Sequence, residues 1–271
     1  MNHHLAEWDA RIARATALAT RDASATELLH FYRALAGWQR ALAEQWLPSQ
    51  TVRPGEHVLD VLDAGLVLDA VPSMLLWLDR TAPPGLRQAT AALTGRSRSE
   101  WRARFEQYVV TRGEMDEAAD PAATFVLEAL VQPLADIVGA RLAEGGAATA
   151  DAPGRCPRCG GLPVAGVLRE EGQGARRSLA CGVCLHEWAF VRLACVACGE
   201  QRFDALPVFT AATFPLARIE ACETCRVYLK TVDGTKDGQV VPVVDDLATV
   251  ALDLWARGEG YTRRRPSLLR T

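Results

Sequence analysis

Four cysteine pairs with identical spacing lie between residues 156 and 225: Cys156-Pro-Arg-Cys159, Cys181-Gly-Val-Cys184, Cys195-Val-Ala-Cys198 and Cys222-Glu-Thr-Cys225. These pairs contain all eight cysteines of the 271-residue chain. A C-x-x-C turn places two thiolates on one side of a tight loop, so two turns supply the four sulfurs of a tetrahedral zinc or iron site. The sequence therefore predicts two metal sites, each with four cysteine ligands.

The order of the pairs indicates how they combine. In the simplest arrangement each site uses two successive pairs, which are Cys156, Cys159, Cys181 and Cys184 for one site and Cys195, Cys198, Cys222 and Cys225 for the other. Gly160 and Gly199 follow the first and third pairs, at a position that suits the positive φ angle of a metal knuckle. Each site would then combine one glycine-bearing and one plain pair. An interleaved arrangement, first with third and second with fourth, is the alternative.

Disulfide bonds or a single redox-active pair explain these cysteines less well. Charged residues interrupt the apolar residues near the N-terminus, so no secretory signal is expected and the predicted location is the cytoplasm, where disulfides are rare. A thioredoxin-like redox motif needs one reactive pair rather than four. The most apolar run, residues 58–78, contains three aspartates, so the sequence predicts no membrane span.

Charge and motif content argue against several other functions. The formal net charge is −3, whereas a surface that binds nucleic acid needs a basic excess. No Ser-His-Asp set, phosphate-binding loop or dinucleotide fingerprint is present, so the sequence predicts a binding protein and not an enzyme. His186 lies two residues after Cys184 and could replace a thiolate, but eight cysteines already complete two sites.

Apolar periodicity divides the chain into a helical half and a strand-rich half. Helical spacing recurs over residues 5–15, 28–46, 58–68, 72–78, 101–109 and 121–142. Ser97 with Glu100, and Asp120 before Pro121, predict two helix starts, and Pro83-Pro84-Gly85 predicts a helix end. Short strands are expected over residues 162–168, 177–180, 187–193, 205–209, 217–221 and 227–231, before a last helix over residues 245–257.

The predicted fold class is α+β. It combines an all-helical N-terminal domain, two tandem rubredoxin-like or zinc-ribbon-like modules with four cysteines each, and a C-terminal helix. The expected bounds are residues 1–143 for the helical domain, 144–155 for a linker, 156–193 for the first module and 194–271 for the second module with the C-terminal helix and tail. The helical domain is expected to fold without metal, and Arg263-Arg264-Arg265-Pro266 is predicted to be a solvated tail.

Residues outside the cysteine pairs carry a resemblance to a known family. They are Glu187-Trp188, Tyr228-Leu-Lys230, Asp245-Asp-Leu-Ala248, Leu252-Asp253 and Gly260-Tyr261. A general zinc ribbon does not share them, and together with the cysteine pairs they resemble the FdhE family of formate dehydrogenase accessory proteins. The N-terminal half is similar to that family only as an alanine-rich helical region. The end of the chain after Tyr261 departs from the family's asparagine-proline ending.

The resemblance implies a function and a metal. It implies a cytoplasmic protein that binds the catalytic subunit of a formate dehydrogenase and assists its maturation. It also implies a rubredoxin-like fold in which all eight cysteines bind iron, with zinc as the alternative because four-cysteine spacing suits both metals. Two other functions stay open: a rubredoxin-type electron-transfer protein or reductase, and a zinc-ribbon module that binds nucleic acid or protein.

Overall fold

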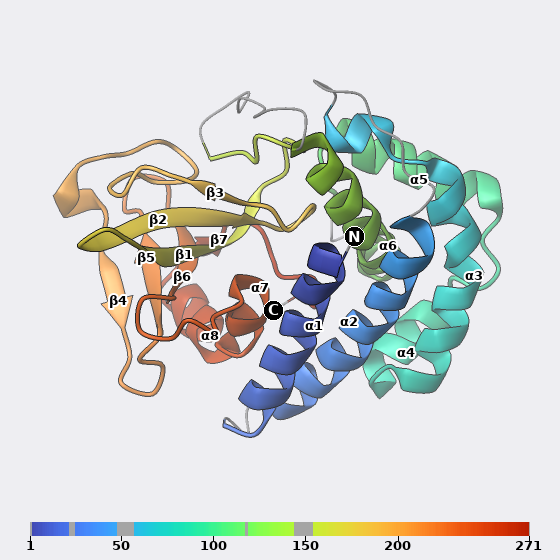
Figure 1. Ribbon diagram of the computed structural model, residues 1–271, viewed down its shortest axis with the longest axis horizontal. Coiled ribbons are helices and arrows are strands. Elements are labelled where there is room, and N and C mark those ends of the chain that lie inside the picture. Colours follow the sequence, from blue (N-terminus) through green and yellow to red (C-terminus); the bar gives the residue numbers. More distant parts are fainter. Residues whose placement is uncertain (1, 22–24, 48–56, 117–118, 144–153, 271) are drawn as a thin grey trace.

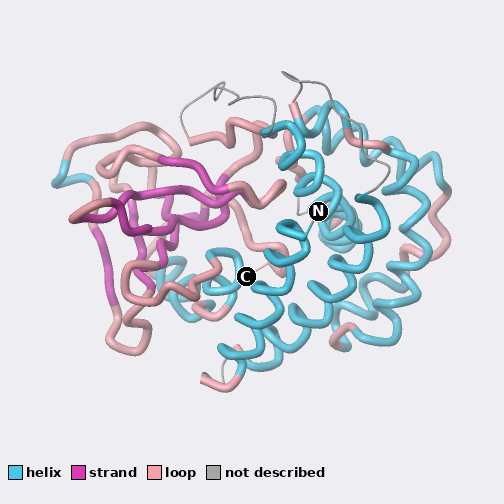
Figure 2. Tube along the Cα trace, viewed as in Figure 1, coloured by secondary structure: helices cyan, strands magenta, loops and turns pink. Residues whose placement is uncertain are grey.

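The N-terminal helices and the strands occupy separate sides of the molecule. The computed structural model describes residues 2–21, 25–47, 57–116, 119–143 and 154–270, so most of the predicted linker lies outside the described residues. Figure 2 shows the N-terminal helices on one side and the strands, with two short helices from the end of the chain, on the other, which confirms the predicted α+β class. The helical side contains α1 (Asn2–Ala19), α2 (Thr26–Trp46), the 3-10 turn η2 (Val58–Val61), α3 (Ala64–Thr81), α4 (Pro84–Ala91), α5 (Arg98–Val110) and α6 (Pro121–Ala143).

Side-chain caps confirm two predicted helix starts. At α5, Ser97 Oγ accepts a hydrogen bond from the amide of Glu100 (3.3 Å), and the Glu100 carboxylate accepts one from the amide of Ser97 (2.7 Å). At α6, Asp120 Oδ1 accepts a hydrogen bond from the amide of Ala123 (3.1 Å), and Pro121 is the first helical residue. Both caps satisfy amides that the first helical turn leaves without a partner.

Two prolines belong to helices that the sequence does not predict in that form. Residues 64–81 form one helix with Pro72 inside it, instead of two helices separated at that residue. Pro72 has no amide hydrogen for the carbonyl oxygen of Leu68, four residues earlier, yet the helix continues through it with the proline ring exposed. The helix end predicted at Pro83-Pro84-Gly85 is confirmed, since α3 ends at Thr81. Pro84 also begins α4, because a proline in the first turn gives up no helical hydrogen bond.

α6 forms the centre of the helical side. Every residue from Ala123 to Gly139 is buried, and α2 and α3 pack against the helix. Among the described residues α6 is the one helix long and apolar enough to cross a membrane, but 94% of that stretch is buried inside the fold. Burial on all sides explains its apolar composition, as in the core helix of a large domain.

The two predicted metal modules are the two halves of one sheet. β1 (Pro163–Glu171), β2 (Gly174–Cys181) and β3 (Glu187–Ala189) pair antiparallel in one half. β4 (Val208–Thr210), β5 (Ala217–Ala221) and β6 (Val227–Asp233) pair antiparallel in the other. The strand order is β3-β2-β1-β6-β5-β4, with the short β7 (Thr262–Arg263) beside β6. The halves meet where β1 and β6 run parallel.

Gly166 allows that meeting of β1 and β6. It is paired with Thr231, and a Cβ atom added at Gly166 would lie 2.3 Å from Thr231 Oγ1. A side chain at this position would push the two strands apart. The absence of a side chain at residue 166 therefore lets the two halves form a continuous sheet.

Two large cores hold the molecule together. The predicted C-terminal helix is two short helices, α7 (Pro242–Leu247) and α8 (Val250–Gly258), and α8 packs on one face of the sheet against Ile219 and Tyr228 (Figure 1). The other core contains the buried residues of the helical side together with the first four cysteines, residues 156, 159, 181 and 184. The helical side and the first cysteine cluster therefore share one core.

The arginine-rich C-terminus is anchored in the fold, so the prediction of a solvated tail is wrong. Arg265 donates hydrogen bonds to Glu128 Oε1 on α6 (2.6 Å) and to the carbonyl oxygen of Gly113 (2.8 Å). Arg270 donates to the other carboxylate oxygen of Glu128 at 2.6 Å. Glu128 is buried, and a carboxylate in an apolar core requires opposite charges beside it. The C-terminal arginines supply those charges.

Candidate metal centre

All four C-x-x-C segments have the same backbone hydrogen bond. In each segment the amide of the first cysteine donates to the carbonyl oxygen five residues later, at 2.9 Å for Cys156, 2.9 Å for Cys181, 2.8 Å for Cys195 and 3.0 Å for Cys222. This bond closes each segment into a compact turn that contains both of its cysteines. The four segments are therefore equivalent knuckles, although their sequences differ.

The residue after the second cysteine of each knuckle has a positive φ angle. The values are 72° at Gly160, 60° at Leu185, 76° at Gly199 and 57° at Arg226. The sequence predicts this conformation only at the two glycines, because a Cβ atom is penalised there. The turn imposes the same conformation on Leu185 and Arg226. A knuckle without glycine is thus no different in shape from one with it.

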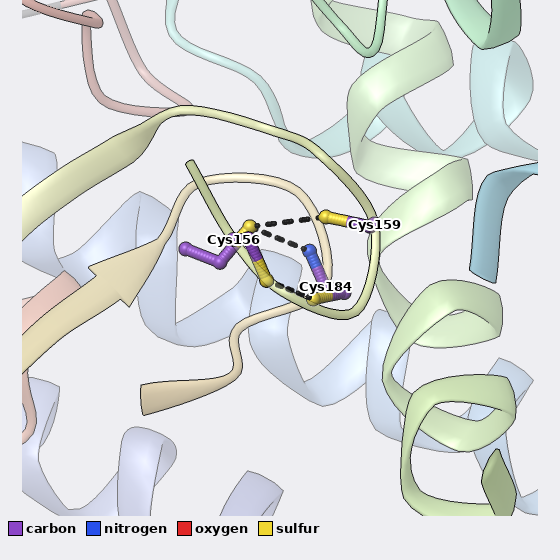
Figure 3. A group of neighbouring side chains, drawn as sticks. Cys156, Cys159 and Cys184 are labelled. Carbon is purple, nitrogen blue, oxygen red and sulfur yellow. Dashed lines mark hydrogen bonds between the residues drawn. The ribbon is translucent and has the colours of Figure 1, made fainter. Parts of the chain in front are cut away.

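The sulfurs of the first and second pairs gather in one group. Cys156 Sγ lies 3.6 Å from Cys184 Sγ, and Cys159 Sγ lies 3.4 Å from Cys181 Sγ. Figure 3 shows Cys156, Cys159 and Cys184 with their sulfurs directed toward one another. All four sulfur atoms lie within 4.8 Å of one another, so the first knuckle pairs with the second.

The third and fourth pairs form an equivalent group. Cys195 Sγ lies 3.7 Å from Cys225 Sγ, and Cys198 Sγ lies 3.7 Å from Cys222 Sγ. These four sulfurs also lie within 4.8 Å of one another. The arrangement is the sequential one expected from the order of the pairs, and the interleaved alternative does not occur.

The spacing of the sulfurs fits a metal ion. A tetrahedral site with metal–sulfur bonds of about 2.3 Å has sulfur–sulfur distances of about 3.8 Å, whereas a disulfide bond is about 2.05 Å long. All eight cysteines are free thiols. The amides of Gly161 and Ala197 lie 3.4 Å from the sulfurs of Cys159 and Cys195, and such hydrogen bonds stabilise thiolates. The donor set therefore suits a divalent ion that prefers sulfur.

The thiols of the first group cannot all ionise without a cation. Hydrogen bonds with Cys156 and Cys181 raise the pKa of Cys159 well above the usual value. Hydrogen bonds with Cys156, Cys159 and Cys181 do the same to the pKa of Cys184. Burial opposes the ionisation of Cys181, but hydrogen bonds from the same group hold its pKa well below the usual value. One thiolate thus forms readily, and each further negative charge in the buried group is repelled by it. A bound divalent metal ion would neutralise two of these four charges and so favour the deprotonation of all four thiols.

The two groups differ in exposure to solvent. Each cysteine of the first group is at most 2% exposed. In the second group Cys195 and Cys222 are buried, Cys225 is half-buried and Cys198 is exposed. A metal ion would be enclosed by the core in the first group and would lie at the surface in the second.

His186 does not join either group of sulfurs, as the sequence predicts. Burial lowers the pKa of His186 to about 4, with a smaller contribution from the positive charge of Arg158. Its ring is stacked near that of Trp188, with 6.4 Å between the centroids. His186 is therefore a neutral packing residue beside the second knuckle.

A buried charge network explains residues that sequence reasoning left without a role. Lys230 Nζ lies 2.5 Å from Asp253 Oδ2 and 3.2 Å from Asp246 Oδ1, and all three side chains are fully buried. Arg263 pairs with the same two carboxylates, and the Tyr228 hydroxyl donates to Asp253 Oδ1 at 2.7 Å. The sequence contains one sign of this network, which is a lysine among the mostly apolar residues of the predicted strand 227–231. These residues fasten β6 to the C-terminal helices.

Comparisons with known proteins agree with the resemblance seen in the sequence. Residues 155–192 match the central domain of FdhE, and residues 193–269 match its C-terminal domain. The FdhE homolog of Aquifex aeolicus is 39% identical over 109 residues, which cover 40% of this chain and 38% of that protein. The homolog of Pseudomonas aeruginosa is 35% identical over 137 residues, which cover 47% and 43%. The matched segment thus spans less than half the length of either relative.

The similarity of structure extends over nearly the whole chain. The crystal structure of the FdhE protein from Pseudomonas aeruginosa matches with a TM-score of 0.73 and 25% identity, covering 97% of this chain and 95% of that one. The resemblance to the FdhE family is therefore confirmed. The helical half shares the fold, although its sequence resembles the family only loosely.

Proposed function

We propose that this chain, whose residues 155–269 carry the central and C-terminal domains of the FdhE family, is an accessory protein in the maturation of a formate dehydrogenase. In this role it binds the catalytic subunit of that enzyme in the cytoplasm and is not itself an enzyme. The observation that carries the proposal is the presence of two four-sulfur groups inside the segments that match those two domains.

Each group of cysteines would hold one metal ion, with iron as the first candidate and zinc as the alternative. Both metals accept four thiolates in tetrahedral geometry. Bound iron would supply one-electron redox chemistry, whereas zinc would supply only a fixed link between chain segments. The chain itself positions the sulfurs through the four knuckles and stabilises their charge with amide hydrogen bonds. The division into a helical domain (1–143), a linker (144–155) and two modules (156–193 and 194–271) is proposed on the same basis.

The arrangement supports binding and not catalysis. A catalytic metal site keeps one coordination position open for water or substrate, whereas four thiolates complete a tetrahedral site. The first group is also enclosed by the helical core, so a substrate has no access to it. Both features favour a protein that recognises a partner.

One observation favours a second candidate function. Cys198 is exposed, so iron in the second group would lie close enough to the surface to exchange an electron with another protein. This is the behaviour of a rubredoxin-type electron carrier. It predicts that the iron-loaded protein is reduced and reoxidised rapidly by a small redox protein, which stopped-flow absorption measures. Zinc in both groups of the natively purified protein would contradict it.

The test of the accessory function is calorimetric binding of the full chain to the catalytic subunit of a formate dehydrogenase. The protein is purified without oxygen and measured with oxidised metal, with reduced metal and after exchange for zinc. We expect a complex in each case, and a redox-controlled complex would differ in affinity by roughly 5-fold to 150-fold between oxidation states. Equal affinities would limit the metal to a structural role. Failure of every form to bind, together with tight binding of DNA or RNA, would contradict the proposal.

A further inference from the structure

The second four-sulfur group lies beside an unusual concentration of exposed apolar side chains. Val191, Leu193, Phe203 and Val208 are 58%, 43%, 81% and 54% exposed, and together they are called the apolar collar below. They are half of the large apolar side chains that are exposed within the described part of the chain. We propose that the collar and the exposed edge of the second group form the surface that binds the partner protein, an inference that rests on the proposed accessory function.

A cavity joins the collar to the sulfurs. It has a volume of about 420 Å³, and Leu193, Phe203 and Val208 line it together with Cys195. The carbonyl oxygen of Val191 accepts a hydrogen bond from Arg177, which lines the same cavity. The collar is therefore the rim of a cavity whose wall includes one of the candidate metal ligands.

The collar lies on the side of the sheet farthest from the helical side of the molecule. Three of its residues belong to the segment that leads into β4, and the fourth is the first residue of β4, an edge strand. Figure 1 shows β4 at the opposite side of the molecule from α3 and α5. A partner could therefore approach the second sulfur group without touching the helical side.

Hydrogen bonds hold the collar in place before any partner arrives. Arg177 donates to the carbonyl oxygens of Val191 (2.9 Å) and Ala194 (3.3 Å) on either side of Leu193. The amide of Glu223 donates to the carbonyl oxygen of Ala205 (2.9 Å), which fixes the turn that carries Phe203. A fixed apolar surface loses little conformational entropy on binding, which favours affinity.

The charges around the cavity identify the kind of partner. Three arginines line it, Arg177, Arg192 and Arg218, and Glu220 is the one acidic side chain among the described lining residues. Arg177 and Arg218 both pair with Glu220, while no ion pair of Arg192 occurs within the described part of the chain. The arginine and glutamate side chains that line the cavity thus carry an excess of positive charge inside an apolar rim. The geometry fits a protein segment with a large apolar side chain and a carboxylate close to it.

The test measures the affinity of full-length, metal-loaded variants for the catalytic subunit of a formate dehydrogenase. Phe203→Ser and Leu193→Ser each remove one collar side chain, and Arg192→Glu reverses the unpaired charge. We expect each to raise the dissociation constant about tenfold or more, as for central residues of an interface. Arg192→Lys keeps the charge and should bind nearly as the unmodified protein does.

Matched controls lie on the opposite side of the molecule. Leu76→Ser on α3 and Val110→Ser on α5 also replace exposed apolar residues, which are 61% and 80% exposed, and should leave the affinity unchanged. Metal content and melting temperature of all variants should equal those of the unmodified protein, since each change is at the surface.

Other outcomes would overturn the assignment of this surface. If the unmodified protein and the collar variants bind the catalytic subunit equally well, the collar is not the binding surface, and the accessory function stands. If the unmodified protein does not bind, both proposals fail. If the collar variants instead abolish a dimer of this chain and leave binding of the catalytic subunit intact, the occupant is a second copy, which also contradicts the proposal.

Discussion

Gly199 and Arg226 occupy equivalent positions in the two knuckles of the second sulfur group and meet the same backbone requirement differently. Arg226 has a φ angle of 57°, and its side chain makes three contacts. It pairs with Glu223, donates a hydrogen bond to the carbonyl oxygen of Glu259 (2.6 Å) and lies 3.9 Å from the ring centroid of Tyr261. Gly199 has no neighbour within 4 Å of its Cβ position. Its contribution is therefore conformational freedom alone.

Gly199→Ala should lower the free energy of unfolding by about 1–2 kcal/mol, because it adds a Cβ atom at a positive φ angle without any clash. Gly238→Ala is the control, since that position is equally open and has no positive φ angle. It should change the stability by less than about 0.5 kcal/mol. Urea unfolding of the metal-loaded protein measures both. Equal effects of the two substitutions would show that the knuckle tolerates a side chain there.

The two lysines of the chain provide a second pair of matched substitutions. Lys230→Met leaves Asp246 and Asp253 buried with only Arg263 between them, so we expect a loss of about 3–5 kcal/mol. Lys236→Met removes an exposed ion pair with Asp233 (3.2 Å) and should cost at most about 1 kcal/mol. Thermal unfolding compares them. A Lys230→Met protein as stable as the Lys236→Met protein would contradict the role of the buried network.

At the scale of elements, local patterns predicted some strands closely. The prediction for residues 227–231 matches β6, and that for residues 217–221 matches β5, because turns and cysteine knuckles mark both ends of each. α4 was missed because the proline-proline-glycine sequence, which correctly marks the end of α3, also begins a helix whose residues carry little apolar pattern. The pairing of β1 with β6 could not be predicted, since it depends on a contact between residues far apart in the sequence.

The anchoring of the C-terminus depends equally on distant contacts. Arg265→Met removes two hydrogen bonds of a buried guanidinium, one of them to the buried carboxylate of Glu128, so we expect a loss of about 2–4 kcal/mol. Arg257→Met on the exposed side of α8 is the control and should be nearly neutral. The midpoint of urea unfolding measures both. A neutral Arg265→Met would restore the interpretation of this segment as a solvated tail.

The different burial of the two sulfur groups should appear in the rate of metal release. A chelator added to the metal-loaded protein should remove one ion quickly from the second group, where Cys198 is exposed, and the other only as the core unfolds. The variant with Cys195→Ser and Cys198→Ser should lose the fast phase and keep the slow one. Metal analysis of samples taken over time measures both phases. Release of both ions at the same rate would contradict the prediction that the second group loses its metal faster than the first.

At the scale of the whole molecule, the shared core changes the expectation for the helical domain. Sequence composition suggests that residues 1–143 fold without metal, because they contain many apolar residues and no cysteine. In the structure the first sulfur group contributes buried residues to the same core as α6. Loss of metal from that group would therefore loosen the helices as well as the sheet. Loss of metal from the second group would affect the knuckle that precedes β4 and the knuckle that joins β5 to β6.

The central claim is that the chain holds two metal ions, each through four cysteine sulfurs. X-ray absorption at the metal edge, with metal analysis of protein purified without oxygen, tests it most directly. The account predicts two ions per chain with four sulfur neighbours each at about 2.3 Å. Replacement of Cys156 and Cys159, or of Cys195 and Cys198, by serine should leave one ion. Nitrogen or oxygen neighbours, a single ion in the unmodified protein, or complete metal loss in either double variant would contradict it.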